Sequence, residues 1–181
     1  AGTDNGDGTW KLGSGDLDGL KITPPADYSG SFDLGVSAMS TDGTDTATTS
    51  DTLTVDVSGV ADDPTLSVAD ATGADDNAIA LNIDAGLTDS SESLSITISG
   101  VPDGASLSAG TDNGDGTWTL SSGDLDGLKI TPPADYSGSF DLGVSATSTD
   151  GSDTATVSDT LTVDVSGVAD DPTLSVADAT G

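Results

Sequence analysis

The sequence predicts an all-β protein built from tandem β-sandwich domains. Three observations support this prediction. Apolar residues alternate with polar ones in short runs, turn-forming residues separate these runs about every ten residues, and no segment has the periodicity of an amphipathic helix. A repeat of about 108 residues makes the arrangement tandem, because a repeat of that length matches a whole domain.

The two copies of the repeat are nearly identical. The run Ala-Gly-Thr-Asp-Asn-Gly-Asp-Gly-Thr-Trp begins at Ala1 and again at Ala109, and residues 1–73 align with residues 109–181 without a gap. The five differing positions are Lys11/Thr119, Gly13/Ser121, Met39/Thr147, Thr44/Ser152 and Thr49/Val157.

The domain boundary is predicted at the run Val-Ala-Asp-Asp-Pro, found at 60–64 and 168–172, because it is short, polar and contains a strand-breaking Pro. This boundary predicts one complete domain, the end of a preceding one and the first strand of a following one. The incomplete first domain is expected to belong to a longer array or to receive its missing strands from a neighbour. The predicted ranges are 1–61 for the preceding repeat, 62–169 for the complete repeat and 170–181 for the first strand of the next.

Within the complete repeat, the strands follow from alternation. In the run at 78–83, for example, Ile79, Leu81 and Ile83 would share one face. One turn of helix is expected near 122–126. Regularly spaced short strands of this kind predict an immunoglobulin-like sandwich. The predicted strands are 66–68, 78–83, 94–98, 106–107, 117–120, 128–131, 140–146 and 161–165.

The composition excludes several functions. The chain has 32 acidic residues and 3 basic ones, with no His and no Cys. Catalysis through His or Cys and a transition-metal site built on them are therefore excluded, and phosphate would be repelled, so we expect no nucleic-acid partner. No apolar run approaches the length needed to span a bilayer, so we expect no membrane insertion. A formal charge of −29 predicts counter-cations, and the available oxygen donors favour Ca²⁺.

The acids are expected to gather at the two ends of the sandwich. Strand alternation in such a sandwich places the loops at 69–77 and 132–139 at the end that faces the following linker, and the loops at 84–93 and 147–160 at the opposite end. The alternative is that each Asp is only a turn residue. Asp70 is grouped with the acids of the first end and Asp84 with those of the second. The candidate Ca²⁺ ligands are Asp75, Asp76, Asp135, Asp170 and Asp171 at one end, and Asp62, Asp63, Asp89, Glu92, Asp150 and Asp153 at the other.

Two further features have competing interpretations. The run Thr111–Gly116 has the composition of a calcium-binding EF-hand loop, but counting from Asp112 puts Gly114 where a ligand is required, so a hairpin turn is favoured. Trp10 and Trp118 could form a sugar-stacking platform, but one Trp per repeat within a strand favours a core position.

Three motifs resemble the cadherin-like and Ig-like repeats of giant RTX-type bacterial adhesins. They are Ile-Ser-Gly-Val-Pro-Asp-Gly-Ala-Ser-Leu near 98–107, Leu-Lys-Ile-Thr-Pro-Pro-Ala-Asp-Tyr-Ser-Gly-Ser-Phe at 128–140, and Val-Ala-Asp-Asp-Pro-Thr-Leu. The resemblance implies type I secretion, a location outside the cell or on its surface, and calcium shared at domain junctions. The segment at 89–92 departs from the family pattern Asp-x-Asp-Gly-Ser-Glu, because it is shorter and lacks one acid.

The resemblance implies a calcium-dependent extender that projects a distal binding module in adhesion and biofilm formation. Neighbouring repeats of the same chain would be its partners, and other regions would bind the adhesive target. We expect no enzymatic activity. The alternative function is a ligand-binding module that recognises a glycan or a surface.

Overall fold

The computed structural model describes residues 1–179 and divides the chain into two compact units, residues 1–58 and 59–181. Strands and short turns make up both units, and no α-helix occurs among the described residues. The architecture is all-β and consistent with a β-sandwich. No described helix has the length and apolar character needed to cross a membrane.

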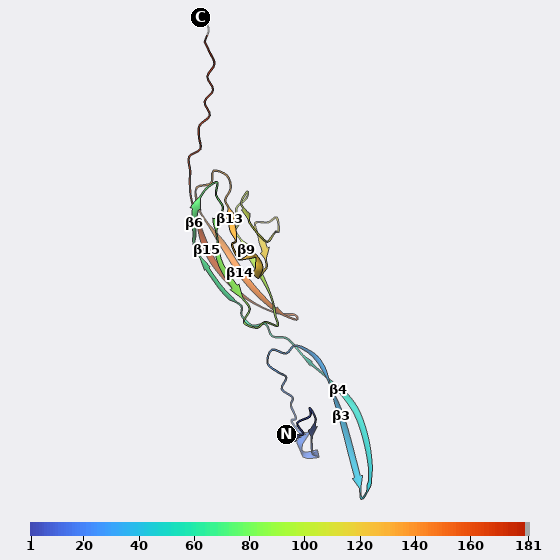
Figure 1. Cartoon of the computed structure of the whole chain (residues 1–181). Helices are drawn as coiled ribbons and strands as arrows, with labels where there is room; N and C mark the ends of the chain where they lie inside the picture. The colour runs from blue at the N-terminus through green and yellow to red at the C-terminus, as the bar shows by residue number, and fades with distance from the viewer. Residues whose placement is uncertain (180–181) are drawn as a thin grey trace. The chain divides into compact units, whose positions relative to one another are not determined.

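The second unit has a large sheet, with strand order β11-β12-β9-β14-β15-β6 (Figure 1). All neighbours are antiparallel except β15 and β6, which are parallel. The strands are β6 (Ala71–Ala74), β9 (Ser93–Ser99), β11 (Thr111–Asp112), β12 (Trp118–Leu120), β14 (Gly138–Asp150) and β15 (Asp153–Ser166).

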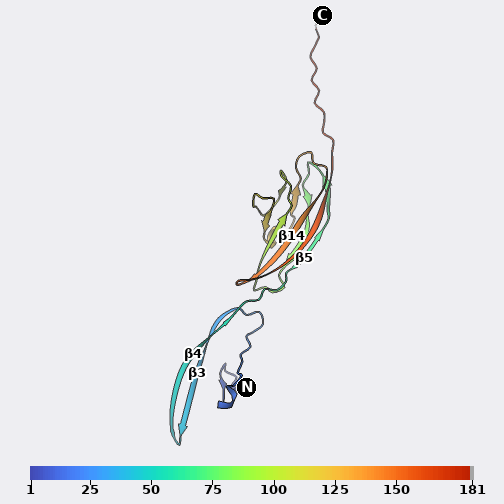
Figure 2. The same cartoon turned by 180° about the vertical axis from the view of Figure 1, so that it is seen from behind.

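Two smaller sheets complete this unit. One has the order β10-β13-β7, and the other pairs β5 with β8. Figure 2 shows β5 beside the long β14 strand. A short 3₁₀ turn, η2 (Ser122–Asp124), lies where one helical turn was expected. The strands are β5 (Thr65–Ala69), β7 (Ile79–Ala80), β8 (Asn82–Gly86), β10 (Ser106–Leu107) and β13 (Lys129–Thr131).

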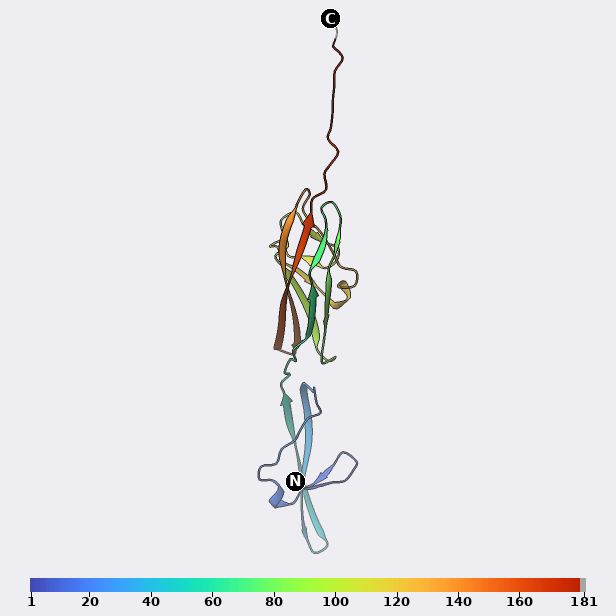
Figure 3. The same ribbon diagram turned by 90° about the vertical axis from the view of Figure 1, so that its left-hand side faces the viewer.

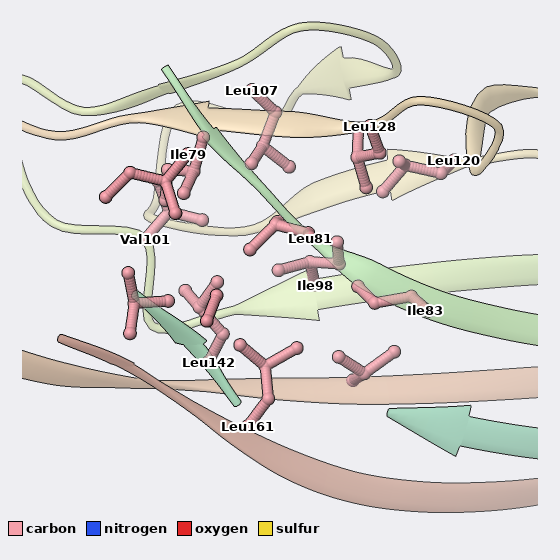
Figure 4. Close-up of a cluster of buried hydrophobic side chains, with 14 of the residues drawn as sticks. Ile79, Leu81, Ile83, Ile98, Val101, Leu107, Leu120, Leu128, Leu142 and Leu161 are labelled. Atoms are coloured by element: carbon pink, nitrogen blue, oxygen red, sulfur yellow. The ribbon is translucent and has the colours of Figure 1, made fainter. Parts of the chain in front are cut away.

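The core lies between the large sheet and the smaller ones. Leu142, Leu161 and Ile98 project from the large sheet toward Ile79 and Leu107 of the three-stranded sheet (Figure 4). In β14 every second residue from 142 to 148 is buried, as expected for a strand with one face on a core. The outward face of β14 and β15 carries hydroxyl residues instead.

The strand at 78–83 differs from its predicted form. It is interrupted at Leu81, whose N–H donates to the Leu128 carbonyl oxygen at 2.9 Å, and the chain then passes from one small sheet (β7) to the other (β8). A second difference is β6, which was expected to be a loop. Its parallel pairing with β15 extends the large sheet by one strand.

The first unit corresponds in sequence to residues 109–166 of the second. It has β1 (Thr3–Asp4), β2 (Trp10–Lys11), the 3₁₀ turn η1 (Ser14–Asp16), β3 (Gly30–Asp42) and β4 (Asp45–Val57). The β3–β4 hairpin (Figure 3) has the same register as β14–β15, because corresponding residues of the two copies pair in both. Its apolar side chains are largely exposed.

Candidate metal sites

The end of the second unit where residues 59–64 enter is organised around Glu92. This side chain is 7% exposed and lies just before β9. Its Oε1 accepts the Asp62 N–H at 2.7 Å. Its Oε2 is buried and has no hydrogen-bond partner among the described residues. A buried carboxylate oxygen without a donor is costly, so this atom indicates a missing cationic or donor ligand.

The backbone of the entering segment is held on both sides. The Ala61 N–H donates to Asp153 Oδ2 at 3.0 Å, and the Ser148 hydroxyl donates to the Asp62 carbonyl oxygen. Thr88 donates to the carbonyl oxygen of Asp63 at 3.1 Å. The structure thus holds the backbone of Asp62 against Glu92 and that of Ala61 against Asp153, and Asp63 follows in the chain.

Asp89 and Asp150 complete this end. Hydrogen bonds from the Ser91 N–H and hydroxyl lower the pKa of Asp89 below its ordinary value of 3.8, so Asp89 is an anion at neutral pH. The carboxyl group of Asp150 lies against Gly59, where a Cβ atom would come within 2.4 Å of it. Asp89 lies in the loop before β9, as expected, whereas Asp150 is the last residue of β14 rather than a loop residue.

At the opposite end, Asp75 is 3% exposed and follows β6. Its N–H donates to the Ser166 carbonyl oxygen at 3.0 Å, and its Oδ1 accepts the Val168 N–H at 2.8 Å. These two bonds tie the acid to the segment that leaves β15. Asp75 therefore lies where the sequence placed it, but it is a buried residue rather than a solvated loop residue.

Asp75 is joined by Asp76, Asp135 and Asp170. The negative charge of Asp76, then that of Asp135 and a side-chain hydrogen bond with Asp135, raise the pKa of Asp170 above its ordinary value of 3.8, with a smaller effect from Asp75. Asp76 and Asp135 both have a φ of 58°, a left-handed conformation that Asp tolerates better than most residues. Asp171 is exposed beside this cluster in the chain.

Two acids grouped with these ends lie elsewhere. Asp70 Oδ1 accepts the Thr162 N–H at 2.9 Å, beside β15, because the chain crosses between sheets at this residue. Asp84 is part of β8 and pairs with Ser67 of β5. Asp70 lies between β5 and β6 and Asp84 lies within β8, rather than in the end loops where they were expected.

One residue of the first end was not identified from the sequence. Ser148 is fully buried on the core face of β14 and donates to the backbone of the entering segment. The sequence contains one sign of this residue. Position 148 continues the alternation of Leu142, Val144 and Ala146, where an apolar residue is expected, but it holds a polar one.

The hairpin interpretation is confirmed, and the core interpretation holds for Trp118 but not for Trp10, which is 59% exposed. β11 pairs with β12 across the turn, and Asp112 and Asp115 use their Oδ1 atoms to accept the N–H groups of Gly114 and Thr117. Trp118 is half-buried against the core.

Chemically, both ends present carboxylate and carbonyl oxygens and no soft ligand. A hard divalent cation with six to eight oxygen ligands fits this donor set, and Ca²⁺ fits best because it tolerates irregular geometry. The partnerless Oε2 of Glu92 makes the first end the stronger candidate.

Comparison with known proteins assigns no family to the chain. No family model matches the chain, and no curated protein matches it. Among solved structures, the chain is similar to an endo-fucoidan hydrolase from glycoside hydrolase family 107, with 21% identity, a TM-score of 0.32 and 81% of this chain covered. The chain spans 20% of the length of that hydrolase.

This comparison corrects the expectation that the chain has no enzymatic activity. The matched structure is named as a hydrolase, so that expectation is withdrawn. A TM-score of 0.32 is too low to assign an activity to this chain.

Proposed function

We propose that this chain is a calcium-dependent extender from the repeat region of a large RTX-type adhesin outside the bacterial cell. In this proposal each repeat is an immunoglobulin-like domain of about 108 residues, and neighbouring repeats of the same chain are its partners. Export by a type I system and a role in adhesion and biofilm formation belong to the same proposal. Other regions of the protein would bind the adhesive target.

The observation that carries the proposal is the buried Oε2 of Glu92, which has no hydrogen-bond partner among the described residues. Leaving a buried anionic oxygen unpaired destabilises the metal-free fold. A cation there would remove this cost. Glu92, Asp89 and Asp62 would hold the ion. Asp63 follows Asp62 in the chain, and Asp150 and Asp153 lie against Gly59 and Ala61 of the same segment.

At the opposite end Asp75, Asp76, Asp135 and Asp170 would hold a second ion, and Asp171 stands next to them. The raised pKa of Asp170 shows that these carboxylates repel one another. Bound Ca²⁺ would supply positive charge to both clusters, so its binding free energy would become folding free energy. The chain would then fold outside the cell, where Ca²⁺ is abundant, rather than before export.

Stiffness would follow from the short junction. The segment at 60–64 contains no flexible Gly/Ser tract, and acids from its own repeat surround it. An ion bound to linker and domain carboxylates would restrict bending there. Near-identical copies in series suit a function that depends on length.

Thermal unfolding of the whole chain in excess EDTA, in millimolar Ca²⁺ and in millimolar Mg²⁺ tests the proposal. Calcium at about ten times its dissociation constant adds roughly 1.4 kcal/mol per site, so two sites should raise the Tm of the second unit by about 10 °C. Mg²⁺ should have a much smaller effect, because it demands regular octahedral geometry.

The matched variants are Glu92→Gln and Asp103→Asn. Glu92→Gln should raise stability in EDTA by about 1–3 kcal/mol, because it removes the unpaired buried charge, and should lose about half of the calcium-dependent rise. Asp103→Asn removes the same charge from an exposed turn and should change neither. A wild-type Tm that does not respond to calcium would sink the proposal and favour the binding-module alternative, which a glycan array would then test.

A further inference from the structure

The N–H groups of the segment that enters the second unit bind carboxylates of that unit. The Ala61 N–H donates to Asp153 and the Asp62 N–H to Glu92, at 3.0 and 2.7 Å. The two acceptors, at the first residue of β15 and just before β9, are 61 positions apart in the sequence (153 minus 92). Hydrogen bonds to an ionised acceptor are stronger than neutral ones, and Glu92 is buried, so these bonds hold the backbone firmly.

The segment that leaves the second unit is held in the same way, but at a different position. The Val168 N–H donates to the buried Asp75 at 2.8 Å. Residues 59–64 and 167–172 have the same sequence, Gly-Val-Ala-Asp-Asp-Pro, so Val168 corresponds to Val60 of the entering segment. The unit therefore binds this sequence twice, and the two binding modes use different N–H groups.

We propose that each linker of the tandem array is a carboxylate clamp that forms without metal. Three successive N–H groups, those of Val, Ala and Asp, would donate in turn to the Asp75 position of the preceding repeat and to the Asp153 and Glu92 positions of the following one. The partner of each linker is thus a second repeat of this sequence. This clamp goes beyond the proposed function and does not depend on it, because it uses no cation.

The glycine that begins the linker supports the proposal independently. A Cβ atom at Gly59 would lie 2.4 Å from the carboxyl carbon of Asp150, on the side of the following repeat. A Cβ atom at the corresponding Gly167 would lie 3.3 Å from Ser137, on the side of the preceding repeat. Both neighbours therefore approach the same linker position closely, and a side chain at position 59 would require the Asp150 carboxylate to move.

The clamp and the cation would use different atoms. Glu92 binds the linker through Oε1 and leaves Oε2 without a partner among the described residues. Asp75 binds through Oδ1. A Gln at position 92 keeps an oxygen acceptor while losing the charge, so one substitution separates the two functions.

Amide hydrogen exchange on the whole chain in EDTA, measured residue by residue by NMR, tests the clamp. The N–H groups of Ala61, Asp62 and Val168 should exchange at least about tenfold more slowly than in an unstructured peptide. Asp153→Ala should release Ala61 alone, and Asp75→Ala should release Val168 alone. The control Asp103→Ala should release none, and the β9 amides of Ile96 and Ile98 report whether a variant still folds.

Free-peptide exchange at these three amides in EDTA, or loss of protection throughout β9, would overturn the clamp. Protection that appears only when Ca²⁺ is added would also overturn it and leave the proposed function standing. In Glu92→Gln, the Asp62 amide should stay protected while the calcium response falls. A protected linker in a wild-type chain that ignores calcium would support the clamp and refute the proposed function.

Discussion

Glu92 and Asp75 are the acidic side chains that the second unit buries among its described residues. Both accept a backbone N–H from a segment at the edge of the domain. Burying an acid is tolerated when its charge is hydrogen-bonded, and these two acids have such bonds on one oxygen each. These two buried acids therefore hold the segments that enter and leave the second unit.

Gly100 shows how one residue can be confined by both conformation and space. Its φ is +79°, and a Cβ atom would lie 2.6 Å from the Asp141 carbonyl oxygen. Gly114 has nearly the same φ, +80°, but a Cβ atom there would meet nothing within 4 Å. The two positions therefore separate the conformational cost of a side chain from its steric cost.

We expect Gly114→Ala to lower the free energy of unfolding by roughly 1–2 kcal/mol, from the left-handed conformation alone. Gly100→Ala should cost roughly 1–3 kcal/mol more, because backbone atoms must also move. Urea unfolding in calcium measures both variants. Equal losses would contradict the steric part of this interpretation.

At the scale of elements, the crossing from β5 to β6 joins one sheet to another. Asp70 stands between the two strands, and its Oδ1 accepts the N–H of Thr162, next to the point where β6 begins to pair with β15. The side chain thus continues the ladder of the large sheet by one hydrogen bond. At this crossing the Asp70 side chain takes the place of a backbone carbonyl acceptor from a neighbouring strand.

We expect Asp70→Ala to lower the free energy of unfolding by about 1–2 kcal/mol, because the Thr162 N–H loses its acceptor. Asp70→Asn changes the charge equally but keeps a carbonyl oxygen, so it should restore most of the loss. The comparison of the two variants by urea unfolding isolates the hydrogen bond. Identical stabilities would assign the effect of Asp70 to its charge.

The long hairpin of β14 and β15 extends further than its apolar residues suggested. Beyond the core, hydroxyl groups face one another on its outer surface: Ser145 lies 2.8 Å from Ser158, and Thr147 lies 2.9 Å from Thr156. Such cross-strand pairs stabilise a sheet without burial. The predicted strands at 140–146 and 161–165 therefore correspond only to the segments with apolar alternation.

At the scale of the molecule, the chain contains one sequence in two packing environments. Residues 17–26 and 125–134 are identical. Leu20 and Ile22 are 46% and 49% exposed, whereas Leu128 and Ile130 are 1% and 0% exposed. In the second unit strands from the segment at 65–99 pack over these side chains, and residues 1–58, which align with 109–166, do not include such a segment.

Trypsin can measure this difference, because the identical segments carry Lys21 and Lys129. Lys129 lies in β13, where its N–H and carbonyl oxygen both bond to Ser108, whereas Lys21 lies outside any strand among the described residues. We expect cleavage at Lys21 to be at least about tenfold faster, since proteolysis requires local opening. Mass spectrometry of timed digests gives both rates, and equal rates would contradict the difference in packing.

Much of this molecule could be anticipated from local patterns. Alternating apolar residues indicated β9 and the core parts of β14 and β15, and the Asn-Gly and Asp-Gly turns indicated the β11–β12 hairpin. The end clusters followed from strand alternation, which places successive loops at opposite ends. The interruption at Leu81 could not be anticipated, because it depends on a hydrogen bond to Leu128 of a distant strand.

The sequence by itself determined the all-β class and the repeat, because apolar alternation and internal identity can both be read along the chain. Only the tertiary structure decided which acids are buried, that Ser148 supports the linker, and that Asp70 and Asp84 lie outside the expected end loops. It also decided that β6 is a strand rather than a loop. The physical reason is that burial and strand pairing depend on partners far along the chain, as the different exposure of identical segments demonstrates.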